Sequence, residues 1–238
     1  MLFRSCFILL AFGPLFAFSQ ATSKTSDYLD ATLAFGKYQG SLAIHYTHFW
    51  NLGKSQRLSL GFGGRITSYI GANQYYVTAP AQLTSESTSP LIFFKDNIEK
   101  NIDTLLIKSP QVTMMNVSLN IQYRISKKIT AGFNIDALGF SFGGKQSANY
   151  INGNTGANTQ ASPTSFNILL ISDNDRGSLN SELFARYAIN DRWSVRGALQ
   201  FLFTEYTTET KVQQFPEAND RFRVKSFMLG AGVTYKLK

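Results

Sequence analysis

Apolar and polar side chains alternate without a break between Met115 and Ile125. Every odd position in this run is apolar or aromatic, and the even positions carry Asn, Ser, Asn, Gln and Arg. Successive side chains of a β-strand point to opposite faces, whereas a helix repeats its apolar face every three to four residues. The run therefore predicts a β-strand with one apolar and one polar face.

Seven further segments alternate in the same way, although less regularly. They are Tyr28–Lys37, Ser41–Trp50, Arg57–Tyr69, a segment from Ile129, Leu179–Ile189, a segment from Trp193, and the C-terminus from Phe227. An even number of antiparallel strands returns the C-terminus to the rim where the N-terminus enters. The pattern predicts an all-β fold, an eight-stranded antiparallel up-and-down barrel.

The connections between these segments alternate in length. Short turns follow the second, fourth and sixth strands, at 51–56, 126–128 and 190–192. Long polar connections follow the third, fifth and seventh strands, at 70–111, 143–177 and 206–223. This asymmetry is typical of outer-membrane barrels, whose long loops lie outside the cell. It favours a transmembrane β-barrel in which the long loops bind any extracellular partner.

Alternation alone does not say which face is inside, and a soluble barrel of the lipocalin kind would bury the apolar face. Two features favour the membrane alternative. The polar face carries almost no Lys at mid-strand, unlike most water-facing strands. Large aromatic residues of the apolar register also lie beside the short turns and the C-terminus, as in the interfacial girdle of membrane barrels. These girdle residues are Trp50, Tyr123, Tyr187, Trp193 and Tyr235.

The first residues have the order of a secretory signal peptide. Arg4 precedes an apolar run from Phe7 to Phe18, and small residues follow. The run is too short to cross a bilayer as a helix, which needs about 20 apolar residues. We expect cleavage after Ser19, or alternatively after Ala21. Residues 1–19 would then be a signal peptide and residues 20–238 one barrel domain.

Composition limits the chemistry that this domain can carry. The chain has 238 residues and a formal net charge of +8. Loss of residues 1–19 removes one basic and no acidic residue, which leaves 22 basic and 15 acidic residues and a charge of +7. The single cysteine, Cys6, lies in the signal peptide, so the mature chain has no disulfide and no cysteine-based site.

Basic residues gather toward the short-turn rim. They are Lys54, Arg57, Lys127, Lys128, Arg192, Lys236 and Lys238. They are either solvated turn residues or a surface that attracts anionic lipid headgroups. A basic rim alone is not specific for nucleic acid, and no base-stacking motif accompanies it, so we expect no nucleic-acid partner.

Three stretches of the sequence carry a resemblance. They are the cleavage region Phe18–Gln20, the strand-to-loop stretch Ile135–Gly143, and the C-terminal stretch Leu229–Lys238. With them, the chain resembles the small outer-membrane β-barrel proteins of Bacteroidota, related to the OmpA/OmpX-type fold. The resemblance implies a bacterial outer-membrane location, with membrane lipids and the barrel-assembly machinery as partners through the C-terminal strand. Family members often end on an aromatic residue, whereas here Tyr235 is followed by three more residues.

If the apolar register faces lipid, the other register places charged residues inside the barrel. The candidates for such a lumen cluster are Arg65, Arg124, Asp136, Glu182, Arg186 and Arg196. Pairing the strands across the turn 190–192 places Arg186 opposite Arg196 and Glu182 opposite Gln200. Two adjacent buried arginines repel and need a carboxylate nearby, which Glu182 and Asp136 can supply. We interpret the cluster as a structural filling of the lumen, because eight strands enclose little more than their own side chains.

The two histidines, His45 and His48, are three residues apart on one predicted strand. They therefore face opposite sides and cannot bind one metal ion together. We expect no metal, no cofactor and no catalytic activity. The sequence favours a structural or interaction role in the cell envelope. A narrow channel or transporter for small or hydrophobic molecules is the first alternative, and a lipid-modifying barrel enzyme is the second.

Overall fold

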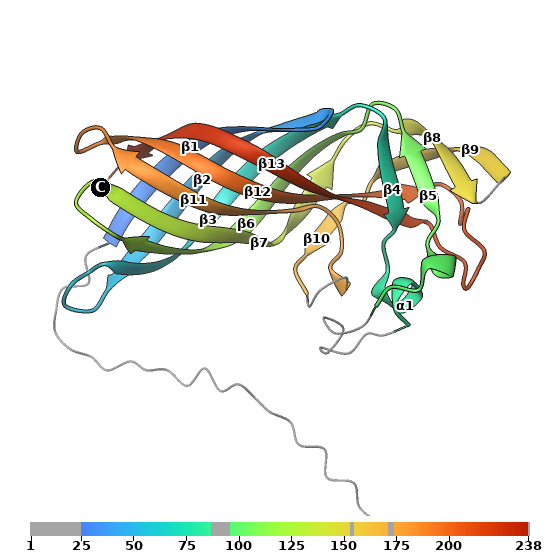
Figure 1. Ribbon diagram of the computed structural model, residues 1–238, viewed down its shortest axis with the longest axis horizontal. Helices are drawn as coiled ribbons and strands as arrows, with labels where there is room; N and C mark the ends of the chain where they lie inside the picture. Colours follow the sequence, from blue (N-terminus) through green and yellow to red (C-terminus); the bar gives the residue numbers. More distant parts are fainter. Residues whose placement is uncertain (1–24, 87–95, 153–154, 171–173, 238) are drawn as a thin grey trace, which may run out of the picture.

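The computed structural model describes residues 25–86, 96–152, 155–170 and 174–237 (Figure 1). The predicted signal peptide, its cleavage site and the first residues of the predicted domain 20–238 lie outside these ranges. The described chain forms one antiparallel sheet of 13 strands. The expected count of eight strands is therefore wrong for the sheet as a whole. No helix among the described residues is long and apolar enough to cross a membrane.

Eight long strands pair with one another in a closed cycle. In the order of pairing they are β1 (Thr25–Gly36), β2 (Gln39–Leu52), β3 (Leu58–Gly71), β6 (Gln111–Arg124), β7 (Ile129–Phe142), β11 (Leu179–Ala188), β12 (Trp193–Thr208) and β13 (Arg221–Lys236). The cycle closes because β13 pairs with β1 as well as with β12. Each predicted strand segment falls in one member of this cycle, and the strands lie side by side in Figure 1.

The alternation of the sequence becomes an outer and an inner face of the cycle. In β6, Leu119 is 54% exposed, whereas its neighbours Ser118 and Asn120 are 0% and 6% exposed. The same arrangement holds along the other strands of the cycle, where the exposed positions are apolar and the buried ones are mostly polar. A water-soluble barrel would have the opposite arrangement. The lipocalin-like alternative is therefore excluded by the direction of the side chains.

A β-bulge interrupts the pairing of β6 with β7. Val117 lies opposite Leu138, but the next residue, Ser118, lies opposite Asp136, so Ala137 has no partner in the ladder. The extra residue reverses the parity of the strand, because side chains alternate with a period of two. This explains why the outward apolar positions of β7 are odd up to Ile135 and even from Leu138 onward, a change that the sequence already shows.

Five shorter strands lie in the connections that were predicted to be long loops. They are β4 (Gln74–Thr78), β5 (Thr104–Ile107), β8 (Gln146–Asn152), β9 (Thr155–Pro163) and β10 (Phe166–Ile168). Two short helical turns, α1 (Ala81–Thr84) and η2 (Glu99–Asn101), lie between β4 and β5. The prediction of long loops at 70–111 and 143–177 is therefore corrected, since backbone pairing to neighbouring strands satisfies the hydrogen bonds of these segments.

Four of these strands close a second ring at one end of the molecule. The pairing runs from β12 through β9, β8, β5 and β4 to β13. Strands β12 and β13 are each 16 residues long. The end of each strand that lies next to the second ring therefore belongs to both rings. Buried aromatic and aliphatic residues such as Tyr76, Leu105, Tyr206 and Phe222 pack inside the second ring. We call β4, β5, β8 and β9 the extension; Figure 1 shows it at the end opposite the C-terminus.

Candidate functional site

Five charged side chains form a buried network inside the cycle of eight strands, which we call the lumen charge network. Its members come from five different strands and are Asp30, Arg65, Asp136, Glu182 and Arg196. The two arginines lie between the three carboxylates. None of the five side chains is more than 5% exposed.

Arg65 contacts two carboxylates and an amide in this network. Its Nε donates to Oδ1 of Asp136 at 2.9 Å, and its Nη1 donates to Oδ1 of Asn134 at 2.5 Å. The same guanidinium lies 3.7 Å from Oε2 of Glu182. Asp136 accepts further hydrogen bonds from Asn116 Nδ2 at 2.7 Å and from the backbone N–H of Asn180 at 3.0 Å. Arg65 and Asp136 are therefore almost fully satisfied by each other and by amides.

Arg196 joins the network to the first strand. Its Nη1 lies 3.1 Å from Oδ2 of Asp30, and its Nη2 donates to Glu182. Glu182 also accepts from Gln200 Nε2 at 3.2 Å. Asp30 is absent from the predicted cluster, because that prediction used only the apolar positions of this strand. The even position of Asp30 among the odd apolar residues of Tyr28–Lys37 is the signal that could have identified it.

The cross-strand register predicted around the turn 190–192 is confirmed. Arg186 lies opposite Arg196, and Glu182 lies opposite Gln200. Arg186 nevertheless makes no ion pair within the described residues. It donates to Gln122, and its guanidinium carbon lies 4.2 Å from the ring centre of Tyr28. Arg186 therefore lies beside the lumen charge network, where Asp30 acts on its charge only from beyond ion-pair distance.

Arg124 is not part of the lumen cluster, which corrects the prediction. Its side chain is exposed at the end of β6, where Nη2 donates to the backbone oxygens of Ser55 and Gln56 at 3.3 and 3.2 Å. Alternation predicted the correct face for Arg124. It could not show that the strand ends at this residue, so that the side chain is exposed at the end of the barrel.

The histidines lie on opposite faces of β2, as their spacing predicts. Nε2 of His45 lies 2.7 Å from Ser118 Oγ inside the barrel. Nδ1 of His48 lies 2.6 Å from Oδ1 of Asp27 at the outer face. No group of three or more His, Cys, Asp or Glu residues suited to a metal ion occurs in the described part of the chain.

The five predicted girdle residues all lie on the outer face near the short turns. Four of them are between 41% and 47% exposed, and Tyr235 is half-buried against Trp193, with the ring centres 4.8 Å apart. Trp50 packs in the same manner against Phe62 at 5.4 Å. The aromatic residues thus form a band at one rim of the cycle.

A second buried charge cluster, which the sequence did not suggest, lies where the two rings meet. Glu205 accepts from Arg221 Nε at 2.8 Å and from Arg223 Nη2 at 2.8 Å. Both arginines also donate to the backbone oxygen of Asp175. Glu205 is 0% exposed, and the two guanidinium groups compensate its buried charge. The cluster therefore ties β12 to β13 at the base of the extension.

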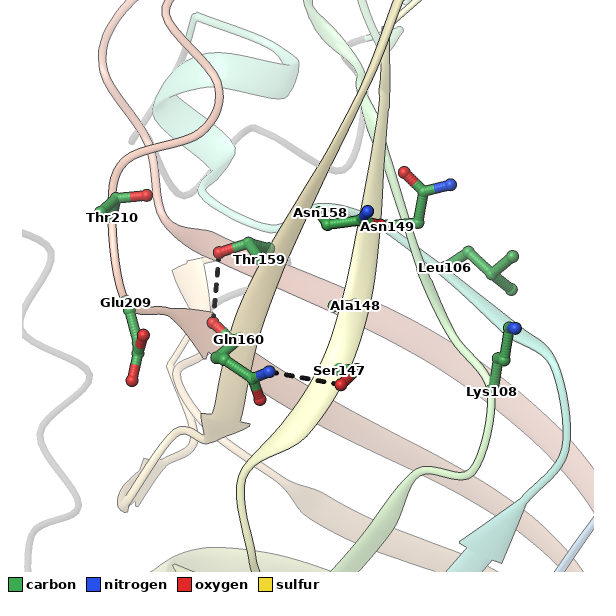
Figure 2. A pocket seen from close by; sticks show the side chains of 10 residues that line it. All are labelled: Leu106, Lys108, Ser147, Ala148, Asn149, Asn158, Thr159, Gln160, Glu209 and Thr210. Atoms are coloured by element: carbon green, nitrogen blue, oxygen red, sulfur yellow. Dashed lines mark hydrogen bonds between the residues drawn. The ribbon is translucent and has the colours of Figure 1, made fainter.

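The outer face of the extension carries a cavity of about 720 Å³. Figure 2 shows its lining of mostly uncharged polar side chains from β8 and β9, including Asn149, Asn158 and Gln160. Nε2 of Gln160 donates to Ser147 Oγ at 3.3 Å across the two strands. Asn149 and Asn158 lie directly opposite each other in the ladder. The surface offers hydrogen-bond donors and acceptors on a pair of hydrogen-bonded strands.

Comparisons with known proteins give distant similarities only. No protein-family model matches the chain, and no curated protein matches it. Among solved structures, the chain is similar to Neisserial surface protein A, with 9% identity, a TM-score of 0.36, and coverage of 90% of this chain and 96% of that chain. It is also similar to Ail, the attachment invasion locus protein of Yersinia pestis, with 7% identity, a TM-score of 0.33 and coverage of 89% and 98%. A major outer membrane protein from Thermus thermophilus has 12% identity, a TM-score of 0.35 and coverage of 90% and 99%. At these identities and scores, the similarities assign no activity or ligand to this chain.

Proposed function

We propose that the closed cycle of eight strands is a transmembrane barrel of the OmpA/OmpX type in a bacterial outer membrane. The observation that carries the proposal is the apolar outer face combined with a polar, charged interior. A transmembrane strand needs about 9–11 residues, and the shortest strand of the cycle, β11, has 10. Lipid tails would cover the exposed apolar residues, and the aromatic band would lie at the membrane interface.

The role that we propose for this barrel is structural or interactive, without catalysis. The girdle residues would contact outer-membrane lipids, and β13 would present the C-terminal strand to the barrel-assembly machinery. The extension would project outside the cell, because it replaces the long loops. Its paired strands and the cavity beside Asn149 and Asn158 support a preformed surface for an extracellular partner.

Orientation and export can be tested together, since Cys6 is the only cysteine of the sequence. A cysteine placed in the extension by Asn158→Cys should react with a membrane-impermeant maleimide on intact cells. A cysteine placed in a short turn by Lys127→Cys should react only after the outer membrane is permeabilised. Both proteins should fractionate with the outer membrane. Labelling of the short-turn cysteine on intact cells would contradict the proposed orientation.

A narrow channel is the second candidate, because the lumen contains charged groups that could line a path. The lumen charge network argues against conduction, since its side chains are buried and bonded to one another across the interior. We expect planar-bilayer recordings of the purified, folded protein to show no steady current. Reproducible single-channel steps from heat-modifiable, folded material would instead support the channel.

A further inference from the structure

The short-turn end of the barrel contains a hollow that the lumen charge network does not fill. Two adjacent cavities, of about 450 and 250 Å³, share Tyr28, Arg124, Thr130 and Lys236 in their walls. We call the two cavities together the short-turn mouth. The larger one has the size of an ordinary ligand pocket, which is about 300–1,000 Å³.

The residues around the short-turn mouth are strongly unbalanced in charge. The basic ones are Arg57, Arg124, Lys127, Lys128, Arg186, Arg192 and Lys236. The one acidic residue among the lining residues is Asp191. None of these seven cations makes an ion pair within the described residues. The lumen charge network next to it, by contrast, pairs each arginine with at least one carboxylate.

Arg186 lies at the inner end of the short-turn mouth. Its burial gives the strongest argument for a bound anion. It is 5% exposed, and its guanidinium lies between the rings of Tyr28 and Phe184, with 4.2 and 5.2 Å to their centres. The cross-strand neighbour of Arg186 is Arg196, and this second arginine takes both Asp30 and Glu182 as its ion-pair partners. No carboxylate lies within ion-pair distance of Arg186 in the described residues, and the nearby Asp30, which acts on it at longer range, is already paired with Arg196. A buried cation that is only partly compensated is costly, and an anion entering from the mouth would offset that cost.

An unpartnered hydroxyl lies in the same place. Ser26 is 5% exposed, lines the smaller cavity, and its Oγ has no hydrogen-bond partner among the described residues. Buried polar atoms are normally paired with protein, water or a ligand, so the Ser26 hydroxyl in the cavity wall is available to a bound molecule. A hydroxyl can donate to an anionic oxygen.

We propose that the short-turn mouth binds a soluble phosphate-bearing anion. Arg124 and Lys236, which line both cavities, would contact the anion from the sides, and Arg186 would face it from the inner end. Guanidinium groups suit phosphate because they present several donors in one plane. Under the orientation proposed above, the ligand would arrive from the periplasm.

The bilayer itself is the competing source of phosphate groups. Two of the seven cations are turned toward the outer wall: Lys128 Nζ lies 5.8 Å from the ring centre of Tyr187, and Arg192 Nη1 donates to Tyr235 Oη at 3.2 Å. These two are placed for lipid headgroups. Arg124 and Lys236 line both cavities of the mouth, which favours a soluble ligand there.

Inorganic tripolyphosphate is a suitable probe for the mature protein refolded in zwitterionic detergent. Calorimetric titration should show saturable binding that weakens as salt is added. The double variant Arg124→Gln/Lys236→Gln removes two exposed cations, so folding should be retained, and we expect affinity to fall about tenfold. The matched control Lys37→Gln/Lys211→Gln removes the same charge from exposed positions at the other end and should bind like the parent protein.

A second arm separates the two sources of phosphate. The protein in phosphatidylcholine nanodiscs should bind tripolyphosphate as it does in detergent, and added phosphatidylglycerol should not replace the probe. The proposal is overturned if tripolyphosphate does not bind, if both double variants lose affinity equally, or if phosphatidylglycerol alone occupies the site. Binding in detergent does not depend on membrane location, so failure here and failure of the proposed orientation are distinguishable.

Discussion

Replacing Arg65 with methionine is expected to destabilise the folded barrel by about 3–5 kcal/mol. The side chain of Arg65 is 0% exposed, and its loss would leave the equally buried Asp136 without its cation. Asn116 and the backbone of Asn180 would still donate to that carboxylate, but they carry no full charge. The measurement is the free energy of unfolding in urea, from barrel refolded into phosphatidylcholine vesicles and followed by tryptophan fluorescence.

Two companion variants separate the ion pair from general damage. Arg124→Met removes an exposed arginine from the neighbouring strand and should change stability by less than about 0.5 kcal/mol. The double variant Arg65→Met/Asp136→Leu removes one charge of each sign and should recover much of the loss, because the net charge of the network is then the same as in the parent. If Arg65→Met unfolds at the same urea concentration as the parent, the network does not stabilise the lumen.

Placing arginine at Leu119 is expected to cost about 2–4 kcal/mol of stability in the same vesicles. Leu119 is 54% exposed on the outer face, near the middle of β6. In water such a substitution would be nearly neutral, since the side chain could extend into solvent. In a bilayer the guanidinium would lie in the hydrocarbon layer, far from both interfaces. The change in stability therefore shows whether water or lipid surrounds the outer face.

The matched variant is Tyr75→Arg in β4 of the extension. Tyr75 is 58% exposed, so it is as accessible as Leu119, but it would lie above the membrane. We expect its stability to remain within about 0.5 kcal/mol of the parent. Equal effects of the two substitutions, whether both small or both large, would contradict a lipid-facing outer wall.

The alternation in the sequence was sufficient to predict the eight strands of the cycle and the inner or outer face of most of their residues. It also predicted the pairing of Arg186 with Arg196, because a three-residue turn leaves few possible registers. The distribution of aromatic residues and turn lengths also predicts which rim faces the periplasm, and the cysteine labelling proposed above tests that orientation. Each of these features is local, since a period of two and a short turn are both contained in a few consecutive residues.

The tertiary structure alone decided the features that depend on residues far apart in the chain. The β8–β9 hairpin is a local pairing, but the extension closes only because β9 pairs with β12, β5 with β8 and β4 with β13, and no local pattern encodes these distant pairings. The same reason explains the network around Arg65 and Arg196, whose carboxylates come from β1, β7 and β11. It also explains why no carboxylate of the described residues lies within ion-pair distance of Arg186 and why Arg124 lies at the rim. Local alternation assigned each charged residue to the inner or the outer face. Only closure of the barrel determined the position of that residue along the barrel axis and which side chains surround it.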